Sequence, residues 1–272
     1  MNHSRAHLLR CLATACAALA PWLAQAACSK AINTPLAPSG QGVNIDGANI
    51  SGIYPEILRT NQSKDTCMFA LSAVPRARLE LLFESGVADI MIPASKTARR
   101  DELGIFVPLS YNRPVLISLQ SERPTFKSLK ELLDQKDLKV ALVRGYDYGP
   151  VYQDTVAELS RQGRLQWEAD PFSVARLLKS GSVHAALMAP TILVGTINDE
   201  ERVRDLASKL RFEPFEELPW TSNGVYISKG LPEGDRQALL EFFDRVAKSG
   251  AVWQGFQQYY AAPVLKAGLK PR

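Results

Sequence analysis

One pattern occurs twice in the sequence and constrains the fold more than any other feature. Residues 81–92 read LLFESGVADIMI, and residues 176–188 read RLLKSGSVHAALM. Each segment has the end of an amphipathic helix, a Ser-Gly stop, a short turn and a buried strand. Gly86 and Gly181 lie 95 residues apart, too far for stacked short repeats. The pattern therefore predicts equivalent helix–strand units in two separate α/β lobes, with a small-molecule cleft between them.

Helices and apolar strands alternate along most of the remaining chain. Pro75 opens the first of the two repeated helices, and residues 235–248 form the clearest amphipathic helix. Nearly continuous apolar runs occupy residues 88–92, 139–143 and 185–188. Such runs are typical of parallel strands buried on both faces. The alternation favours parallel α/β sheets.

The first 26 residues have the composition of a secretory signal peptide. Arg5 and Arg10 form a basic start, and an apolar run of about 13 residues follows, too short to span a bilayer core of ~30 Å. The separated arginines argue against the twin-arginine route. An N-terminal anchor and a lipid on Cys28 are alternatives, although Cys28 lacks the usual aliphatic residue three positions before it. We therefore predict Sec-type export to the periplasm.

The predicted mature chain is close to neutral. Removal of 26 residues from 272 leaves 246, with 30 basic and 28 acidic side chains. This balance indicates no attraction to nucleic acid or membrane. No later apolar stretch reaches the ~18 residues of a transmembrane helix. We expect a soluble monomer without a membrane span.

Two cysteines, Cys28 and Cys67, remain after the leader takes Cys11 and Cys16 with it. One cysteine pair in an exported chain predicts one disulfide. The alternative is two free thiols.

The residues needed for several kinds of catalysis are missing. His184 is the one histidine of the mature chain, in the turn between the second repeated helix and its strand, where we expect a surface residue. One histidine and one cysteine pair cannot make a zinc cluster and offer little for a nucleophile with a histidine base. Glycine-rich nucleotide-binding motifs are absent as well. We therefore predict a binding protein with no catalytic residue, metal or cofactor.

Polar residues follow the first repeated strand, where ligands of open α/β sheets bind. Ser95 offers a hydroxyl there, Thr97 can cap a short helix, and Arg100 lies three residues into that helix. A guanidinium group at this position can hold a carboxylate through two hydrogen bonds. The alternative is a capped surface helix with solvated arginines. We expect Arg100 near the surface in either case.

The order of these elements resembles the family 3 extracellular solute-binding proteins, the periplasmic amino-acid-binding type that serves ABC importers. The resemblance covers most of the mature chain through weak motifs in a consistent order. They are SGVADI at residues 85–90, the Ser95, Thr97 and Arg100 spacing, LKEL at 129–132, KVALVRG at 139–145, the second repeat, and GVYISK at 224–229.

The resemblance implies a type II periplasmic-binding-protein fold, with two α/β lobes joined by two crossing strands. The lobes would be residues 27–111 with 222–272, and residues 112–221. Ser95 and Arg100 would hold a ligand carboxylate in the first lobe, and the turn at Tyr146 and Asp147 would supply helix N-terminal amides from the second. A transient partner would be an ABC permease.

Three positions depart from the family pattern. Leu36 and Arg76 stand where the family often has aromatic residues, and Ala189 stands where an acid takes the ligand's amino group. Arg76 and Arg100 together would favour a polar or anionic solute, such as an organic acid, over a standard α-amino acid.

Two rival functions remain open. One is a carbon–oxygen lyase on the same fold, similar to the cyclohexadienyl and arogenate dehydratases, for which Glu56 is the best candidate acid. The other is a periplasmic sensor or partner protein that docks on a receptor.

Overall fold

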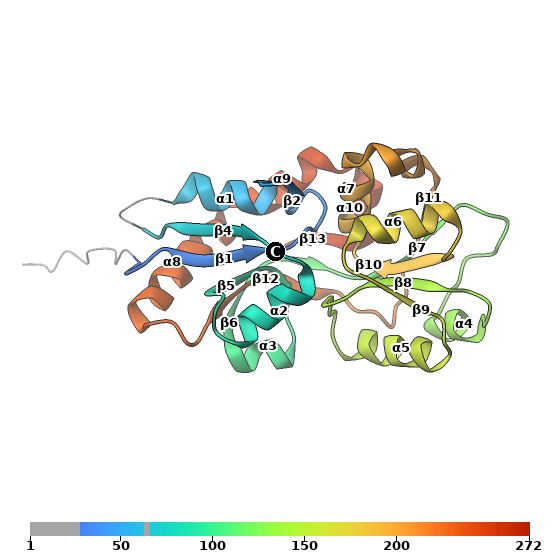
Figure 1. The fold of residues 1–272 in the computed structure, drawn as a ribbon, viewed down its shortest axis with the longest axis horizontal. Helices are drawn as coiled ribbons and strands as arrows, with labels where there is room; N and C mark the ends of the chain where they lie inside the picture. The colour runs from blue at the N-terminus through green and yellow to red at the C-terminus, as the bar shows by residue number, and fades with distance from the viewer. Residues whose placement is uncertain (1–27, 63–65) are drawn as a thin grey trace, which may run out of the picture.

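Two α/β lobes lie side by side along the long axis of the molecule (Figure 1). This computed structural model describes residues 28–62 and 66–272. The predicted signal peptide at residues 1–26 lies outside the described residues.

The first lobe is built on a four-stranded sheet with the order β13-β6-β12-β5 and on a parallel pair, β1-β4. These strands are β1 (Ile32–Leu36), β4 (Phe69–Ala73), β5 (Ile90–Ser95), β6 (Gly104–Asn112), β12 (Thr221–Ser228) and β13 (Leu269–Pro271). The helices and the hairpin around them are α1 (Ile53–Asn61), α2 (Arg76–Glu84), α3 (Ala98–Leu103), α8 (Glu233–Ser249), β2 (Asn44–Asp46) and β3 (Asn49–Ser51). β1 lies beside β5, and the backbone N–H of Asp89, just before β5, donates to the carbonyl of Asn33 in β1.

The second lobe is built on a five-stranded sheet with the order β11-β7-β10-β8-β9. Its strands are β7 (Val115–Leu119), β8 (Val140–Val143), β9 (Leu165–Glu168), β10 (Ala185–Met188) and β11 (Leu210–Glu213). Its helices are α4 (Leu129–Asp134), α5 (Pro150–Arg161), α6 (Pro171–Ser180), α7 (Pro190–Asp199) and the 3₁₀ helix η1 (Glu201–Lys209). β8 pairs in parallel with both β9 and β10, and every residue of β8 and β10 is buried, as their apolar sequences predict.

The two repeats have the same local construction. α2 and α6 both end beside a glycine with a left-handed backbone, Gly86 and Gly181, each with a φ of 72°. A glycine tolerates this conformation because it has no Cβ, so each chain turns sharply into its strand, β5 or β10. β5 extends to Ser95, three residues further than the apolar run alone predicts.

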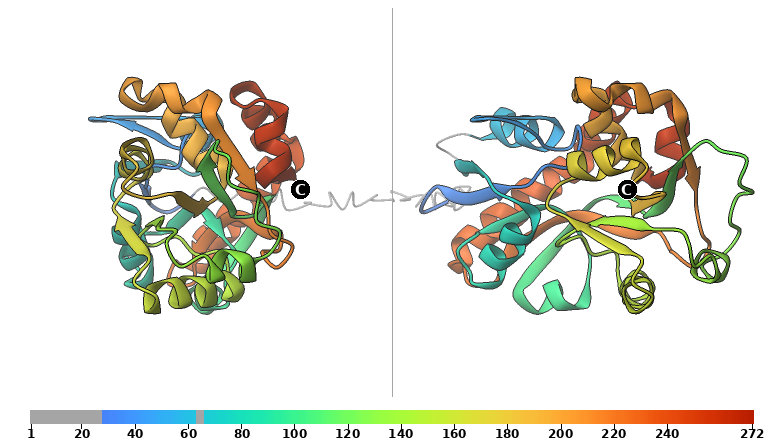
Figure 2. Two further views of the ribbon diagram at one scale, coloured as in Figure 1. Left: turned by 90° about the vertical axis from the view of Figure 1, so that its right-hand side faces the viewer. Right: turned by 45° about the vertical axis from the view of Figure 1, so that its right-hand side comes forward.

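Two connections join the lobes, and they lie next to each other. β6 and β12 pair antiparallel, with Asn112 opposite Thr221 at the edge of the second lobe. β13 pairs with the other edge of β6 at the same level, Leu269 opposite Asn112. The C-terminal helices α9 (Ala251–Tyr259) and α10 (Ala262–Gly268) precede β13. α10 packs against α7 of the second lobe, so the C-terminal segment contacts both lobes (Figure 2).

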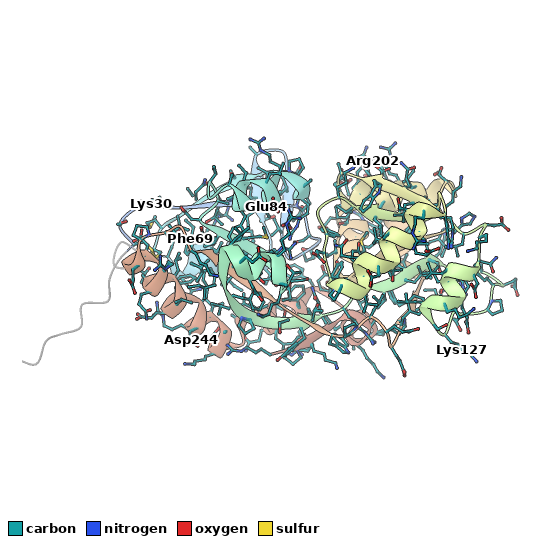
Figure 3. All side chains as sticks on the ribbon, turned by 90° about the horizontal axis from the view of Figure 1, so that it is seen from below. Lys30, Phe69, Glu84, Lys127, Arg202 and Asp244 are labelled. Atoms are coloured by element: carbon teal, nitrogen blue, oxygen red, sulfur yellow. A yellow bond between two sulfur atoms is a disulfide. The ribbon has the colours of Figure 1, made fainter. Side chains whose placement is uncertain are left out.

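Apolar side chains pack inside both lobes around the sheets. Viewed from below, the side chains form two groups, with Lys30, Phe69, Glu84 and Asp244 on the first lobe and Lys127 and Arg202 on the second (Figure 3). The predicted Cys28–Cys67 disulfide is confirmed.

Candidate functional site: a cavity between the lobes

A cavity lies where the two lobes meet, with about 540 Å³ of empty space, part of it open to solvent. Both lobes and the C-terminal segment contribute to its wall. The lining residues are Ser39, Gly42, Tyr54, Arg76, Pro93, Ser95, Asn112, Tyr146, Asp147, Tyr148, Ala189, Thr191, Ile192, Asn223, Phe256 and Leu269. This combination of aromatic walls and few charges is typical of a small-molecule site.

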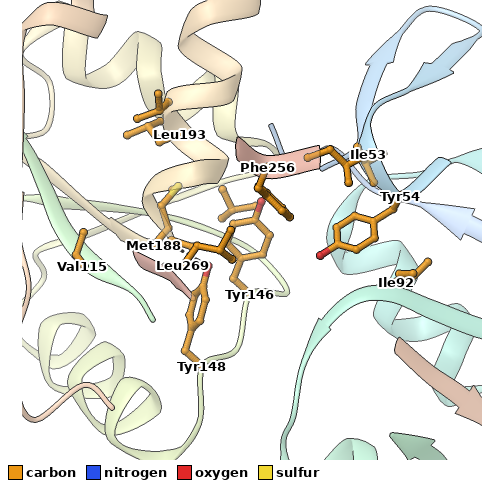
Figure 4. Packing of buried hydrophobic residues seen from close by; sticks show 14 of the residues in the cluster. Ile53, Tyr54, Ile92, Val115, Tyr146, Tyr148, Met188, Leu193, Phe256 and Leu269 are labelled. Atoms are coloured by element: carbon orange, nitrogen blue, oxygen red, sulfur yellow. Dashed lines mark hydrogen bonds between the residues drawn. The ribbon is translucent and has the colours of Figure 1, made fainter. Parts of the chain in front are cut away.

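Aromatic rings make up much of the wall. Tyr54 of α1 and Phe256 of α9 pack edge to face with their centroids 6.1 Å apart. Tyr146 and Tyr148, in the turn after β8, pack edge to face at 6.3 Å. Figure 4 shows these four rings close to the boundary between the lobes. A ligand between them would contact ring surfaces from both lobes.

Burial keeps the tyrosine hydroxyls of the cavity protonated. Desolvation raises the pKa of Tyr148 to about 12 and raises the pKa values of Tyr54 and Tyr146 further above their usual range. The Tyr148 hydroxyl accepts a hydrogen bond from the backbone of Ala189 at 3.1 Å. This leaves its own proton to donate to another acceptor.

Hydroxyl and amide groups supply the other polar contacts of the wall. Ser95 ends β5, and Asn223 lies opposite it on β12. The Asn223 amide donates to the Tyr54 hydroxyl at 3.3 Å. Within the part of the chain that the structure describes, the buried Ser39 hydroxyl oxygen has no hydrogen-bond partner. Because buried polar groups are almost always paired, Ser39 is suited to contact a ligand or water.

The two predicted anchor arginines share one internal partner, Glu80. Arg100 uses its Nε and Nη2 atoms to hold the two carboxylate oxygens of Glu80, at 3.3 and 2.5 Å. Arg76 Nη2 contacts the same carboxylate at 3.0 Å. The two guanidinium groups and the carboxylate therefore form a largely buried ion cluster in the first lobe, which reaches the cavity wall through Arg76.

Arg100 is not near the surface, and this expectation was wrong. Only 4% of Arg100 is exposed, and its Nη1 atom donates to the carbonyl of Ser95 at 2.8 Å. Thr97 caps α3 as predicted, accepting from the Arg100 backbone at 3.4 Å. The neighbouring Arg99 is the solvated arginine. Arg100 is outside the set of described residues that line the cavity, so its role as a ligand anchor stays a prediction.

The predicted turn at Tyr146 and Asp147 does line the cavity and contacts the opposite lobe. The Tyr146 hydroxyl donates to the carbonyl of Pro38 at 3.3 Å, and Arg76 Nε donates to the carbonyl of Gly145 at 3.3 Å. The Asp147 carboxylate accepts from the backbone of Gly149 at 2.8 Å, at the start of α5. One of the helix-start amides expected for a ligand is therefore occupied by Asp147.

Ala189 and Leu36, two of the positions that depart from the family pattern, have clear places in the structure. Ala189 lines the cavity directly after β10 and brings no carboxylate. Leu36 ends β1 in the core, and the first lobe draws a cavity aromatic, Tyr54, from α1. Tyr54 was not among the predicted site residues, because a tyrosine in the first turn of a helix has no local feature that distinguishes it from a core residue.

Other site residues were also missed. Asn112, Tyr148, Asn223 and Phe256 line the cavity. Nothing local distinguishes them from structural residues, because they meet only when the crossing strands and α9 converge. An aromatic cluster at residues 146, 148 and 152 was the one available signal.

Over residues 28–62 and 66–272, no group of three or more His, Cys, Asp or Glu side chains could hold a metal ion. In the same residues, no helix is long and apolar enough to cross a membrane. His184 is exposed, and its Nδ1 atom accepts from the backbone of Lys139 at 3.0 Å.

Neither protein-family models nor curated protein sequences match the chain. Solved structures do. AbpA, a substrate-binding protein of an amino acid ABC transporter from Streptococcus pneumoniae, bound to L-arginine, is 19% identical with a TM-score of 0.65, over 87% of this chain and 94% of that one. A histidine kinase sensor domain with similarity to periplasmic binding proteins is 16% identical with a TM-score of 0.68, over 90% and 99%. An ancestral arginine-binding protein bound to arginine is 13% identical with a TM-score of 0.65, over 85% and 98%.

These likenesses establish the fold. The chain has the two-lobed fold of type II periplasmic binding proteins, and the predicted fold class is confirmed.

Proposed function

We propose that this chain is an exported solute-binding protein of the family 3 type, which captures a small polar solute and delivers it to an ABC permease. The cavity carries this proposal, because its wall combines aromatic and hydrogen-bonding groups from both lobes. Ligand between the lobes would contact each of them and favour the closed arrangement.

The proposed hinge lies where the chain passes between the lobes. We divide the chain into residues 27–111 with 222–272 and residues 112–221, with the protein acting as a periplasmic monomer. The pairing of Asn112 with Thr221 supports this division, since both crossings then bend at one level.

A thermal-shift screen of the mature protein tests the proposal. The screen contains amino acids, organic acids and uncharged polar solutes. Ligand at about 100 times its Kd adds about 2.7 kcal/mol, a melting shift on the order of 5–10 °C. Tyr148→Phe removes one hydroxyl from the cavity and should weaken binding about 3–10-fold. Tyr259→Phe, at an exposed position outside the cavity, is the matched control. A screen without any shift would contradict the proposal.

Sensing is the second candidate, favoured by the similarity to a histidine kinase sensor domain. A solute-binding protein and a sensor would share the cavity and differ in the partner of the closed form. Pull-down of a purified permease or receptor domain with and without ligand separates them.

The enzyme alternative loses its candidate acid. Glu56 is exposed on α1, outside the described cavity wall, and Asp147 is engaged with the Gly149 backbone. Incubation with prephenate or arogenate should therefore yield no aromatic product.

A further inference from the structure

Carboxylates of the protein itself contact both places expected to hold a ligand carboxylate, at Arg100 in the first lobe and at one backbone amide in the second. In the first lobe Glu80 occupies the two-nitrogen edge of Arg100. In the second lobe Asp147 accepts from the backbone at the start of α5. These two contacts come from different elements and different lobes.

The contact of Glu80 leaves little room for a second carboxylate at Arg100. The Arg100 side chain is only 5% exposed and that of Glu80 is 17% exposed. Arg100 Nη1 is directed to the carbonyl of Ser95. A carboxylate held by both Nε and Nη2 makes the strongest arrangement available to a guanidinium group, and Glu80 already has that arrangement.

Helix geometry holds Glu80 in this position. Arg76 and Glu80 lie one turn apart on α2 and form an i,i+4 ion pair at 3.0 Å. Arg76 is tied in addition to the carbonyls of Pro93 and Gly145. A ligand carboxylate that displaced Glu80 from Arg100 would leave Arg76 to neutralise Glu80 alone. Breaking one ion pair of a largely buried cluster in this way costs free energy that the ligand would have to supply.

The remaining polar groups of the cavity suit a ligand without charge. Ser39, Asn223 and the protonated Tyr148 hydroxyl offer neutral donors and acceptors. Resting on the proposed solute-binding function, we propose that Glu80 is an internal counter-ion that closes the arginine pair to ligand carboxylates, so that the cavity selects an uncharged polar solute. Glu80 is then a specificity-determining residue of the site.

Chemical rescue tests this proposal. Glu80→Ala keeps Cβ and removes the –CH2–COO− end of the side chain, so acetate should occupy the vacated space and stabilise the variant. We expect a melting shift on the order of 5 °C at saturating acetate and an apparent Kd for acetate at least tenfold lower than in the wild type. Glu84→Ala is the matched control, because Glu84 lies on the same helix and pairs with the exposed Arg99. This control should not respond to acetate.

Glu80→Ser also removes the carboxylate from the arginine pair and serves if Glu80→Ala does not fold. It should bind acetate more tightly than the wild type does, since it leaves two guanidinium groups without a carboxylate and opens the space that Glu80 filled. Failure of the folded variants to gain affinity would overturn the proposal, and so would a wild-type protein that binds acetate, propionate or succinate with micromolar affinity. The rescue does not depend on the native ligand, so a failed solute screen and a failed rescue are separate results.

Discussion

At the scale of single residues, two adjacent arginines have opposite environments. Arg100 is buried against Glu80, whereas the Arg99 side chain is 73% exposed. Arg100→Ala should lower the free energy of unfolding by about 3 kcal/mol, the lower end of the range for breaking a buried ion pair, because Arg76 still neutralises Glu80. Arg99→Ala should lower the free energy of unfolding by less than about 1 kcal/mol. Urea denaturation of both variants measures the difference, and equal small losses would show that Arg100 is solvated.

The ligand affinity of the Arg100→Ala variant distinguishes a ligand-binding role of Arg100 from a structural role. A direct anchor predicts a loss of ~30-fold or more for the native ligand. The internal ion cluster predicts little change in affinity beside the loss of stability.

The cavity tyrosines link stability to alkaline pH. The folded pKa of Tyr148, raised by burial to about 12, lies above the ~10 of an unfolded tyrosine. The contribution of Tyr148 to the free energy of unfolding is therefore complete below pH ~10. It is lost as the pH rises from there through 12, because the unfolded chain releases the tyrosine proton first. The loss amounts to on the order of 2–3 kcal/mol. Denaturation at pH 8 to 11.5 should show a weaker pH dependence in Tyr148→Phe than in the wild type or Tyr259→Phe. Identical slopes in all three would contradict burial of the neutral phenol.

At the scale of elements, the disulfide joins the starts of the parallel pair β1 and β4. Cys28 precedes β1 and Cys67 precedes β4, with a sequence separation of 39 residues. Replacing both cysteines by serine should lower the free energy of unfolding by up to about 4 kcal/mol, according to the chain-entropy model. Thiol titration of the predicted mature protein, residues 27–272, unfolded without reductant, should find no free thiol. Two reactive thiols would contradict the bond.

At the scale of the whole molecule, the backbones of the two lobes approach each other closely beside the cavity. A Cβ on Gly40 would lie 2.5 Å from the carbonyl oxygen of Thr191 and 2.8 Å from that of Ile192, both in the second lobe. Gly40 and Gly47 have almost the same left-handed φ, 59° and 57°, but a Cβ on Gly47 would point into open space. Alanine at either position therefore carries a similar backbone strain of about 1–2 kcal/mol.

Gly40→Ala should additionally force the lobes apart. We expect a larger radius of gyration in small-angle X-ray scattering and a ligand affinity reduced about tenfold or more, equivalent to about 1.4 kcal/mol. Gly47→Ala should retain the wild-type radius and affinity. Matching radii in the two variants would mean that the contact does not limit closure.

Features that depend on local pattern could be predicted from the sequence. The repeated helix, glycine and strand predicted two lobes because a left-handed glycine and an apolar run need no distant partner to be recognised. The predicted leader contains Cys11 and Cys16, which left Cys28 and Cys67 as the expected pair, and the Thr97 cap depends only on its neighbours in the chain. Ser95 was found for the same reason, since it follows a recognisable strand.

The tertiary structure alone decided how the charges of the site are used. Glu80 lies 20 residues from Arg100 and reads as an ordinary helix-surface residue until α2 and α3 pack together. Tyr54 and Asn223 come from opposite ends of the chain and meet at the cavity, 169 residues apart. An ion pair or a cavity wall is a property of distances in space, and those distances follow from how the sheets and crossing strands assemble. The sequence therefore located the arginines, and only the fold showed that the protein supplies their counter-ion.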